Sequence, residues 1–434
     1  MSRPNILLIV ADSFRADALG PGNPFRAQTP NLNRLGAHST RFTTAIAQSS
    51  HTGGSVPSMM TSGYNLTDGP EGRLPEDRHC LAEVLAEAGY ATGAFHSNPL
   101  ISRPYGFGRG FARFYDSLRV SSRLGVWLRR LLIGLSSRPY VSGSRMVRMV
   151  SRWIGEAGRP FFLWAQFMDT HGPYLPHGGV KVSRWHASRL WKRSVLHPES
   201  VSARNRELLR RLYREEVEYF DRCVGRLIAN LDRLGLREDT VLAVTADHGE
   251  QFCEHGHYNH PRQLYEEQIH VPLLINRPGR EGAVAAQQVQ LVDLAPTLCR
   301  LAGVERPPCW RGHDLFGDLA DHEVAFSATT GWWETAGQHI HAARTPERKV
   351  ILYARNGSVL REEAYHLSED PSEQVDLAER GQNDGPPWEE LRARLLSHMQ
   401  GAKVTEGGAA EPEPASEAEK SELQRRLKAL GYYE

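Results

Sequence analysis

Short apolar runs alternate with helical patterns along the chain as far as about residue 307. The runs lie at residues 5–10, 91–95, 161–167, 241–245 and 271–275, and the helical patterns at 29–35, 79–88 and 203–234. Continuous apolar strands are covered on both faces, as in parallel sheets. The alternation therefore predicts an α/β fold, a sandwich in which helices flank a mostly parallel sheet.

The pattern changes after Pro307. Three short strands are expected at residues 340–345, 349–354 and 363–367, with an Asn356-Gly357 turn between them. They predict a small antiparallel C-terminal subdomain. Residues 401–420 are rich in Gly, Ala, Glu and Pro, which is typical of a flexible linker, and a last helix follows at 421–430. We therefore divide the chain into an α/β domain (1–307), a small α+β subdomain (308–400) and a linker with a terminal helix (401–434).

The charge balance excludes some classes of protein. Lys and Arg number 52 against 51 Asp and Glu, a net charge of +1, which argues against a dedicated nucleic-acid binder. No apolar run is long enough for a membrane span, and the first run is too short for a secretory signal. The five cysteines are scattered and form no CxxC pair, as in reduced cytoplasmic proteins. We therefore expect a cytoplasmic location.

Residues 119–152 are rich in arginine. They predict a basic helical insertion. Its segment 124–135 has the pattern of a basic amphipathic helix, suited to peripheral contact with a membrane surface or to an anionic substrate. We favour the simpler interpretation, a solvated helical insertion that packs on the sheet.

Polar side chains follow three of the predicted strands. Asp12 comes after the first, Asp169 and His171 after the run at 161–167, and Asp247 and His248 after the run at 241–245. Ligands of open α/β sheets bind at the carboxyl ends of the strands. Any one of these residues alone would be read as a loop or helix-cap residue. Together, Asp12, Asp247 and His248 predict a site for a divalent metal ion, Mg, Mn, Ca or Zn.

Several blocks of the sequence resemble the sulfatase family of the alkaline phosphatase superfamily. They lie, in the order of that family, at residues 5–17, 29–35, 42–52, 81–99, 162–176, 241–275, 292–298 and 365–377. The resemblance implies an alkaline-phosphatase-like fold and a metal-dependent hydrolase or transferase that acts on a small anionic ester.

The resemblance also implies roles for individual residues. Asp12, Asp247 and His248 match metal ligands, whereas Ser13 stands where many sulfatases have a second Asp ligand. His171 matches a histidine that contacts the bound anion. His260 falls where relatives place a Lys or His that contacts the anion or protonates the leaving oxygen.

Three further expectations concern charge at the site. Arg15 is expected to offset substrate charge together with His171 and His260. A second metal, with Asp169, His171 and His260 as ligands, is the alternative to a single metal. We favour a single metal, because related single-metal blocks carry the same Asp-x-His.

Two alignments compete for the nucleophile. The Pro57-Ser58 pair favours Ser55, whereas the spacing to Thr61-Ser62 and the spacing from Phe42 both lead to Thr52. We favour Thr52, which would also ligate the metal, with Ser55 among the substrate-binding residues. Classical sulfatases oxidise Cys or Ser to formylglycine, and threonine cannot form that aldehyde.

The choice of nucleophile decides the predicted reaction. A metal-activated Thr52 hydroxyl predicts cleavage of a phosphate ester or phosphodiester through a covalent intermediate, followed by hydrolysis or by transfer to an acceptor. The alternatives are a sulfate-ester hydrolase that uses formylglycine, and a catalytically silent binding homologue.

Overall fold

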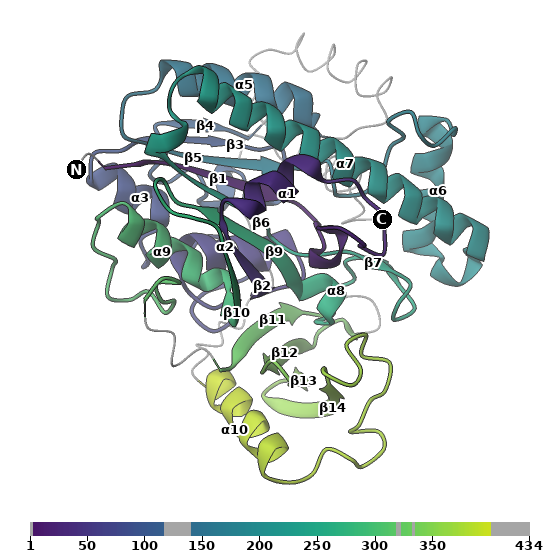
Figure 1. Ribbon diagram of the computed structural model, residues 1–434. Coiled ribbons are helices and arrows are strands. Elements are labelled where there is room, and N and C mark those ends of the chain that lie inside the picture. Colours follow the sequence, from purple (N-terminus) through teal and green to yellow (C-terminus); the bar gives the residue numbers. More distant parts are fainter. Residues whose placement is uncertain (1–2, 117–139, 318–322, 332–334, 401–434) are drawn as a thin grey trace.

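The computed structural model describes residues 3–116, 140–317, 323–331 and 335–400 (Figure 1). The predicted amphipathic segment 124–135 and the predicted linker and helix at 401–434 lie outside these residues. Of the basic insertion, helix α5 (Gly143–Glu156) is described. It packs on strands β3 and β5 and on helix α7 (Ala203–Arg233), as expected for a helix that covers the sheet.

An eight-stranded sheet forms the centre of the larger domain, in the order β10-β2-β9-β6-β1-β5-β3-β4. Its strands are β1 (Asn5–Ala11), β2 (Thr40–Ile46), β3 (Ala91–Phe95), β4 (Arg113–Tyr115), β5 (Phe161–Phe167), β6 (Thr240–Ala246), β9 (His270–Asn276) and β10 (Ala283–Gln290). All pairs are parallel except those of β9, which runs antiparallel to both β6 and β2. The predicted α/β fold with a mostly parallel sheet is confirmed.

Helices cover both faces of this sheet (Figure 1). In one layer, α7 contacts α1 (Pro30–Ala37) and α5. In the other, α2 (Thr52–Thr61), α3 (Leu81–Glu87) and α9 (Leu294–Leu301) contact one another. Helix α6 (Arg184–Leu196) packs beside α7. Every residue of β1, β5 and β6 is buried, which explains why these strands are mostly apolar.

A four-stranded antiparallel sheet, β11-β12-β13-β14, forms the C-terminal subdomain. Its strands are β11 (Ala325–Thr330), β12 (His339–Arg344), β13 (Arg348–Arg355) and β14 (Ser358–His366). Asn356 and Gly357 have positive φ angles (50° and 77°), as a tight hairpin turn requires. The predicted antiparallel subdomain is confirmed, whereas the boundary at residues 307 and 308 stays a prediction.

Helix α10 (Pro386–Gln400) packs on one face of this small sheet through Trp388, Leu391 and Leu395. The subdomain is joined to the larger domain by buried charges. Lys349 on β13 is fully buried, and its Nζ lies 3.1 Å from Glu266 Oε1 and 2.7 Å from Glu373 Oε1. None of the helices in the described ranges has the length and the apolar character that a membrane crossing requires.

His398 connects α10 to the larger domain. Its ring stacks on Phe326 at a centroid distance of 4.1 Å, and its Nε2 lies 3.3 Å from Thr67 Oγ1. Burial lowers the pKa of His398 to about 4. In the unfolded state this histidine binds a proton near pH 6.5, whereas in the folded state it does so only near pH 4. The free energy of unfolding therefore falls as the pH drops from 6.5 toward 4.

We therefore expect His398→Phe to make unfolding less sensitive to acid. Phe keeps the stacking but cannot be protonated. Between pH 7 and pH 4.5, the free energy of unfolding of the variant should rise relative to wild type by about 2 kcal/mol. Urea titrations of both proteins at the two pH values measure this difference, and His197→Gln, at an exposed position, is the control. A difference that does not change with pH would contradict the assignment.

Candidate active site

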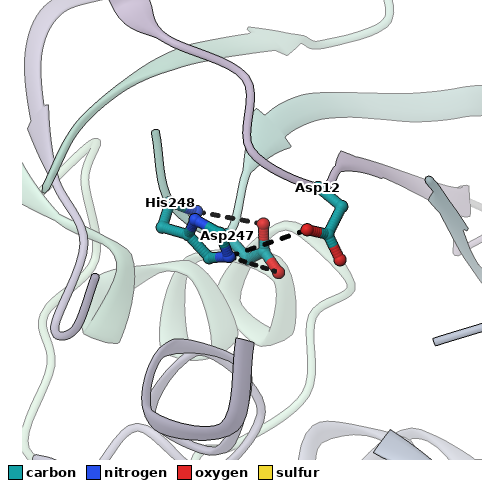
Figure 2. Close-up of side chains that lie close together, drawn as sticks. All are labelled: Asp12, Asp247 and His248. Carbon is teal, nitrogen blue, oxygen red and sulfur yellow. Dashed lines mark hydrogen bonds and ion pairs between the residues drawn. The ribbon is translucent and has the colours of Figure 1, made fainter. Parts of the chain in front are cut away.

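Two neighbouring parallel strands deliver the three predicted metal ligands to one edge of the sheet. Ala11 of β1 pairs with Ala246 of β6, so Asp12 and Asp247 follow the two strands at the same level. His248 Nε2 lies 3.6 Å from Asp12 Oδ1 and 3.9 Å from Asp247 Oδ2 (Figure 2). One ligand atom from each of the three buried residues lies within 4.8 Å of the others, close enough to hold a metal ion.

The backbone orients His248 for metal binding. Its Nδ1 lies 2.9 Å from the carbonyl oxygen of Gly249, which can only accept a hydrogen bond, so Nδ1 carries the proton. Nε2 therefore presents its lone pair to the two carboxylates. Burial lowers the pKa of His248, which keeps the imidazole neutral, as a metal ligand must be.

The two carboxylates repel each other in the absence of a cation. The pKa of Asp247 is raised well above its usual range by burial and by the charge of Asp12. Gln166 offsets part of the repulsion, since its Nε2 donates to Asp12 Oδ2 (3.2 Å) and to Asp247 Oδ2 (3.0 Å). A divalent cation would offset the rest. Two carboxylates and an imidazole suit Mg, Mn, Ca or Zn, so the residues fit the metal that the sequence predicts.

Thr52 is brought to these ligands and Ser55 is not. Thr52 is the first residue of α2, and its Oγ1 lies 3.3 Å from Asp12 Oδ2 and 3.4 Å from His248 Nε2. The helix N-terminus also favours negative charge at this position. Ser55 lies one turn further along, fully buried, and its hydroxyl has no hydrogen-bond partner among the described residues.

His171 and His260 lie together beside the metal ligands. Their Nε2 atoms are 3.1 Å apart, and the rings of His260 and His248 have a centroid distance of 4.6 Å. His171 Nδ1 donates to the carbonyl oxygen of Gly172 (2.7 Å), so His171 Nε2 accepts from the Nε2–H of His260. Burial lowers the pKa of both histidines, and for His260 the neighbouring His248 and His171 lower it further. A bound anion would raise the pKa of both histidines.

Arg15 and Asp169 have other partners in this structure. The guanidinium of Arg15 donates to Asp17 (2.7 Å from Nη2 to Oδ2), to Glu254 (2.6 Å) and to the backbone oxygen of Glu250. Asp169 Oδ1 accepts from the backbone N–H of Gly143 (3.0 Å) and so caps the start of α5. The contact of Arg15 with substrate and the second metal at Asp169 stay predictions. In this arrangement the named contacts of Arg15 and Asp169 are with protein groups.

The sequence analysis missed Asn98, Gln166 and Glu71. Asn98 follows β3 by three residues and donates to Asp12 Oδ2 and Thr52 Oγ1. The rule that assigned function to polar residues after strands would have found it, had amides been counted with carboxylates and imidazoles. Gln166 lies within β5, where a polar residue in an apolar run is itself the signal.

Glu71 connects the active-site loops to the C-terminal subdomain. Its carboxylate lies 3.3 Å from Nε2 of His51, the residue before Thr52, and 3.3 Å from Nη1 of Arg262. It also accepts hydrogen bonds from the backbone and the hydroxyl of Thr330, at the end of β11. No pattern in the sequence links residues so far apart.

The sequence is similar to those of curated proteins. Among curated proteins, Arylsulfatase K of Bos taurus is 26% identical over 442 aligned residues, which cover 86% of this chain and 78% of that protein. The Ulvan-active sulfatase of Formosa agariphila is 25% identical, over 72% of this chain and 64% of that protein.

Solved structures share the fold at low sequence identity. The phosphonate monoester hydrolase of Agrobacterium radiobacter has a TM-score of 0.74 at 18% identity, covering 92% of this chain and 96% of that one. The structure of BT4656 in complex with D-glucosamine-2-N,6-O-disulfate has a TM-score of 0.72 at 18% identity, covering 95% of this chain and all of that one.

Two family models match the sequence. One, described as N-sulphoglucosamine sulphohydrolase, C-terminal, matches residues 253–402. The other, described as Sulfatase, matches residues 4–304, which include Thr52, His171, His260 and the three predicted metal ligands. This chain therefore belongs to the sulfatase family, within the alkaline phosphatase superfamily.

Proposed function

We propose that this sulfatase-family hydrolase is a metal-dependent enzyme that cleaves a phosphate ester or phosphodiester through a covalent intermediate on Thr52. The observation that carries the proposal is the position of the Thr52 hydroxyl, within 3.4 Å of both Asp12 and His248. Threonine cannot become formylglycine, so its own oxygen must attack. The metal would be held by Asp12, Asp247 and His248, with Thr52 Oγ1 as a further ligand.

The first step transfers the phosphoryl group to the protein. The Thr52 proton passes to Asp12 Oδ2, Oγ1 forms a bond to phosphorus, and the bond from phosphorus to the leaving oxygen breaks. His260 enters the step as an imidazolium, stabilised by the charge of the bound anion, and the leaving oxygen takes the proton from its Nδ1, while Nε2 keeps its hydrogen bond to His171. A bound divalent cation lowers the pKa of the attacking hydroxyl and neutralises an oxygen of the substrate. The N-terminus of α2 adds favourable electrostatics at Oγ1.

The second step clears the intermediate. A water molecule, or an acceptor hydroxyl in a transferase, attacks phosphorus and gives its proton to His260. The bond from phosphorus to Thr52 Oγ1 breaks, and Oγ1 regains its proton from Asp12. His171 orients His260 in both steps, because its Nε2 accepts the hydrogen bond that fixes the imidazole.

Sulfate-ester hydrolysis is the second candidate function. The relatives named above that carry sulfatase in their names favour it. It would require a formylglycine, formed at Ser55 or elsewhere. Mass spectrometry of the peptide that contains residues 41–73 detects this modification directly. A silent homologue, the third alternative, would lack stoichiometric metal.

A panel of aryl phosphate monoesters, phosphodiesters, phosphonates and sulfates, assayed with Mn²⁺, Mg²⁺, Ca²⁺ and Zn²⁺, tests the proposal. We expect kcat/KM for a phosphate ester or diester to exceed that for the matching aryl sulfate by about 100-fold or more, because the site is built for a threonine oxygen attacking phosphorus. Dominant sulfate turnover would contradict the proposal and support the second candidate.

A further inference from the structure

Asn98 is held in one orientation by the backbone. It is fully buried and precedes the short helix η2 (Pro99–Ile101). Its Oδ1 accepts a hydrogen bond from the backbone N–H of Leu100 at 2.9 Å. Because a backbone N–H can only donate, this contact identifies Oδ1 as the atom that faces η2. The NH₂ group of Asn98 must therefore point the other way, into the active site.

This NH₂ group reaches two functional oxygens. Nδ2 lies 2.8 Å from Asp12 Oδ2 and 3.1 Å from Thr52 Oγ1. An amide nitrogen has two donors and no acceptor, so both oxygens accept from it. The hydroxyl of Thr52 accepts from Asn98 and is left to donate its own proton to Asp12 Oδ2, 3.3 Å away. A lone pair of Oγ1 is thus already occupied by a donor before any proton leaves.

We propose that Asn98 positions the Thr52 oxygen for attack and stabilises the negative charge that develops on it. The inference rests on the proposed function of Thr52. A hydrogen bond to a charged oxygen is about twice as strong as one to a neutral hydroxyl, so the interaction strengthens as the proton moves to Asp12. The same donor acts again when the bond from phosphorus to Oγ1 breaks and the electron pair returns to Oγ1. Asn98 therefore contributes to the formation of the intermediate and to its breakdown.

A purely structural role of Asn98, the capping of η2, would depend on a different atom from the proposed role. Capping of η2 uses Oδ1, whereas the proposed role uses Nδ2. Asn98→Ser keeps a short oxygen that can cap the turn and removes the donor to Thr52. Asn98→Asp keeps the capping oxygen and replaces the donor by a second acceptor. Ser183→Ala, which removes a cap from α6 without touching the site, is the matched control for the loss of a cap.

The experiment compares wild type and the three variants as full-length proteins with Mn²⁺ and bis-p-nitrophenyl phosphate. For Asn98→Ser we expect kcat to fall about 100-fold, with KM changed by less than about threefold, as for removal of one donor to a developing oxyanion. The Mn²⁺ stoichiometry, measured by calorimetric titration, should remain one per chain. Asn98→Asp should lose at least as much kcat, and Ser183→Ala should keep wild-type kcat.

Two results would overturn the inference. One is an Asn98→Ser variant with kcat within about threefold of wild type, which would leave only the capping role. The other is loss of Mn²⁺ binding by that variant, which would place Asn98 among the groups that build the metal site. Failure of the proposed function looks different. In that case wild type forms no phosphorylated Thr52 detectable by mass spectrometry, and the inference falls with it.

Discussion

Thr52→Ala should lose nearly all turnover of phosphate esters, with kcat lower by about 1,000-fold or more. The substitution removes the hydroxyl oxygen that lies 3.3 Å from Asp12 Oδ2 and 3.4 Å from His248 Nε2 at the start of α2. The residual rate would come from the metal and the histidines acting on a water molecule. Steady-state kinetics with bis-p-nitrophenyl phosphate, and mass spectrometry of quenched reactions for a phosphorylated residue 52, measure the effect.

Ser55→Ala tests the alternative alignment, and its KM tests the predicted contact of Ser55 with substrate. It removes a hydroxyl from the same helix, one turn further along, at a buried position without a hydrogen-bond partner in the described part of the chain. We expect kcat within about threefold of wild type. If Ser55→Ala abolished activity while Thr52→Ala retained it, the alternative alignment of the motif would be correct and Thr52 would not be the nucleophile.

Removal of the metal should abolish activity and lower the melting temperature. Without a cation, the buried carboxylates of Asp12 and Asp247 repel each other, and burial together with this repulsion raises the pKa of Asp247. A chelator should therefore give an inactive protein that regains both activity and thermal stability when Mn²⁺ is added back. Differential scanning calorimetry and metal analysis measure the two effects.

Asp247→Asn should change metal binding and the thermal stability of the metal-free protein in opposite directions. The variant should bind Mn²⁺ at least about 100-fold more weakly and lose turnover, because a charged ligand is gone. Its metal-free form should nevertheless melt at a higher temperature than metal-free wild type above pH 7, because the buried carboxylate that resists ionisation is gone. A lower melting temperature for the metal-free variant would show that the two carboxylates do not repel each other in the folded protein.

Asp169→Asn tests whether the metal site extends further. Asp169 caps α5 through Gly143. We expect the variant to melt at a lower temperature than wild type and to retain one Mn²⁺ per chain. A change in metal stoichiometry would instead favour the two-metal alternative.

The sequence predicted those parts of the fold in which burial alone sets the pattern. Strands β3 and β5 begin and end at the predicted residues, since full coverage by helices makes such strands apolar. Strand β10 was missed because its first half is exposed and polar near the edge of the sheet. The antiparallel direction of β9 was also missed, because an apolar run carries no information about strand direction.

Residue patterns were informative about only part of the site. Asp12, Asp247 and His248 were predictable because each directly follows a strand, and parallel strands end at one edge. The ion pair of Arg15 with Glu254 was not predictable, since Glu254 lies far along the chain and only tertiary packing brings the two together. Contacts of this kind depend on loop paths that residue spacing does not determine.

The contact between Glu71 and Thr330 has a consequence for chimeric enzymes. Consider a chimera in which the C-terminal region is exchanged for that of a relative at a junction near residue 307. Such an exchange would replace Thr330 but keep Glu71, whose carboxylate also faces His51 beside Thr52. The two positions therefore have to be inherited as a pair, and a graft that ignores this would disturb the reaction centre from outside the α/β domain.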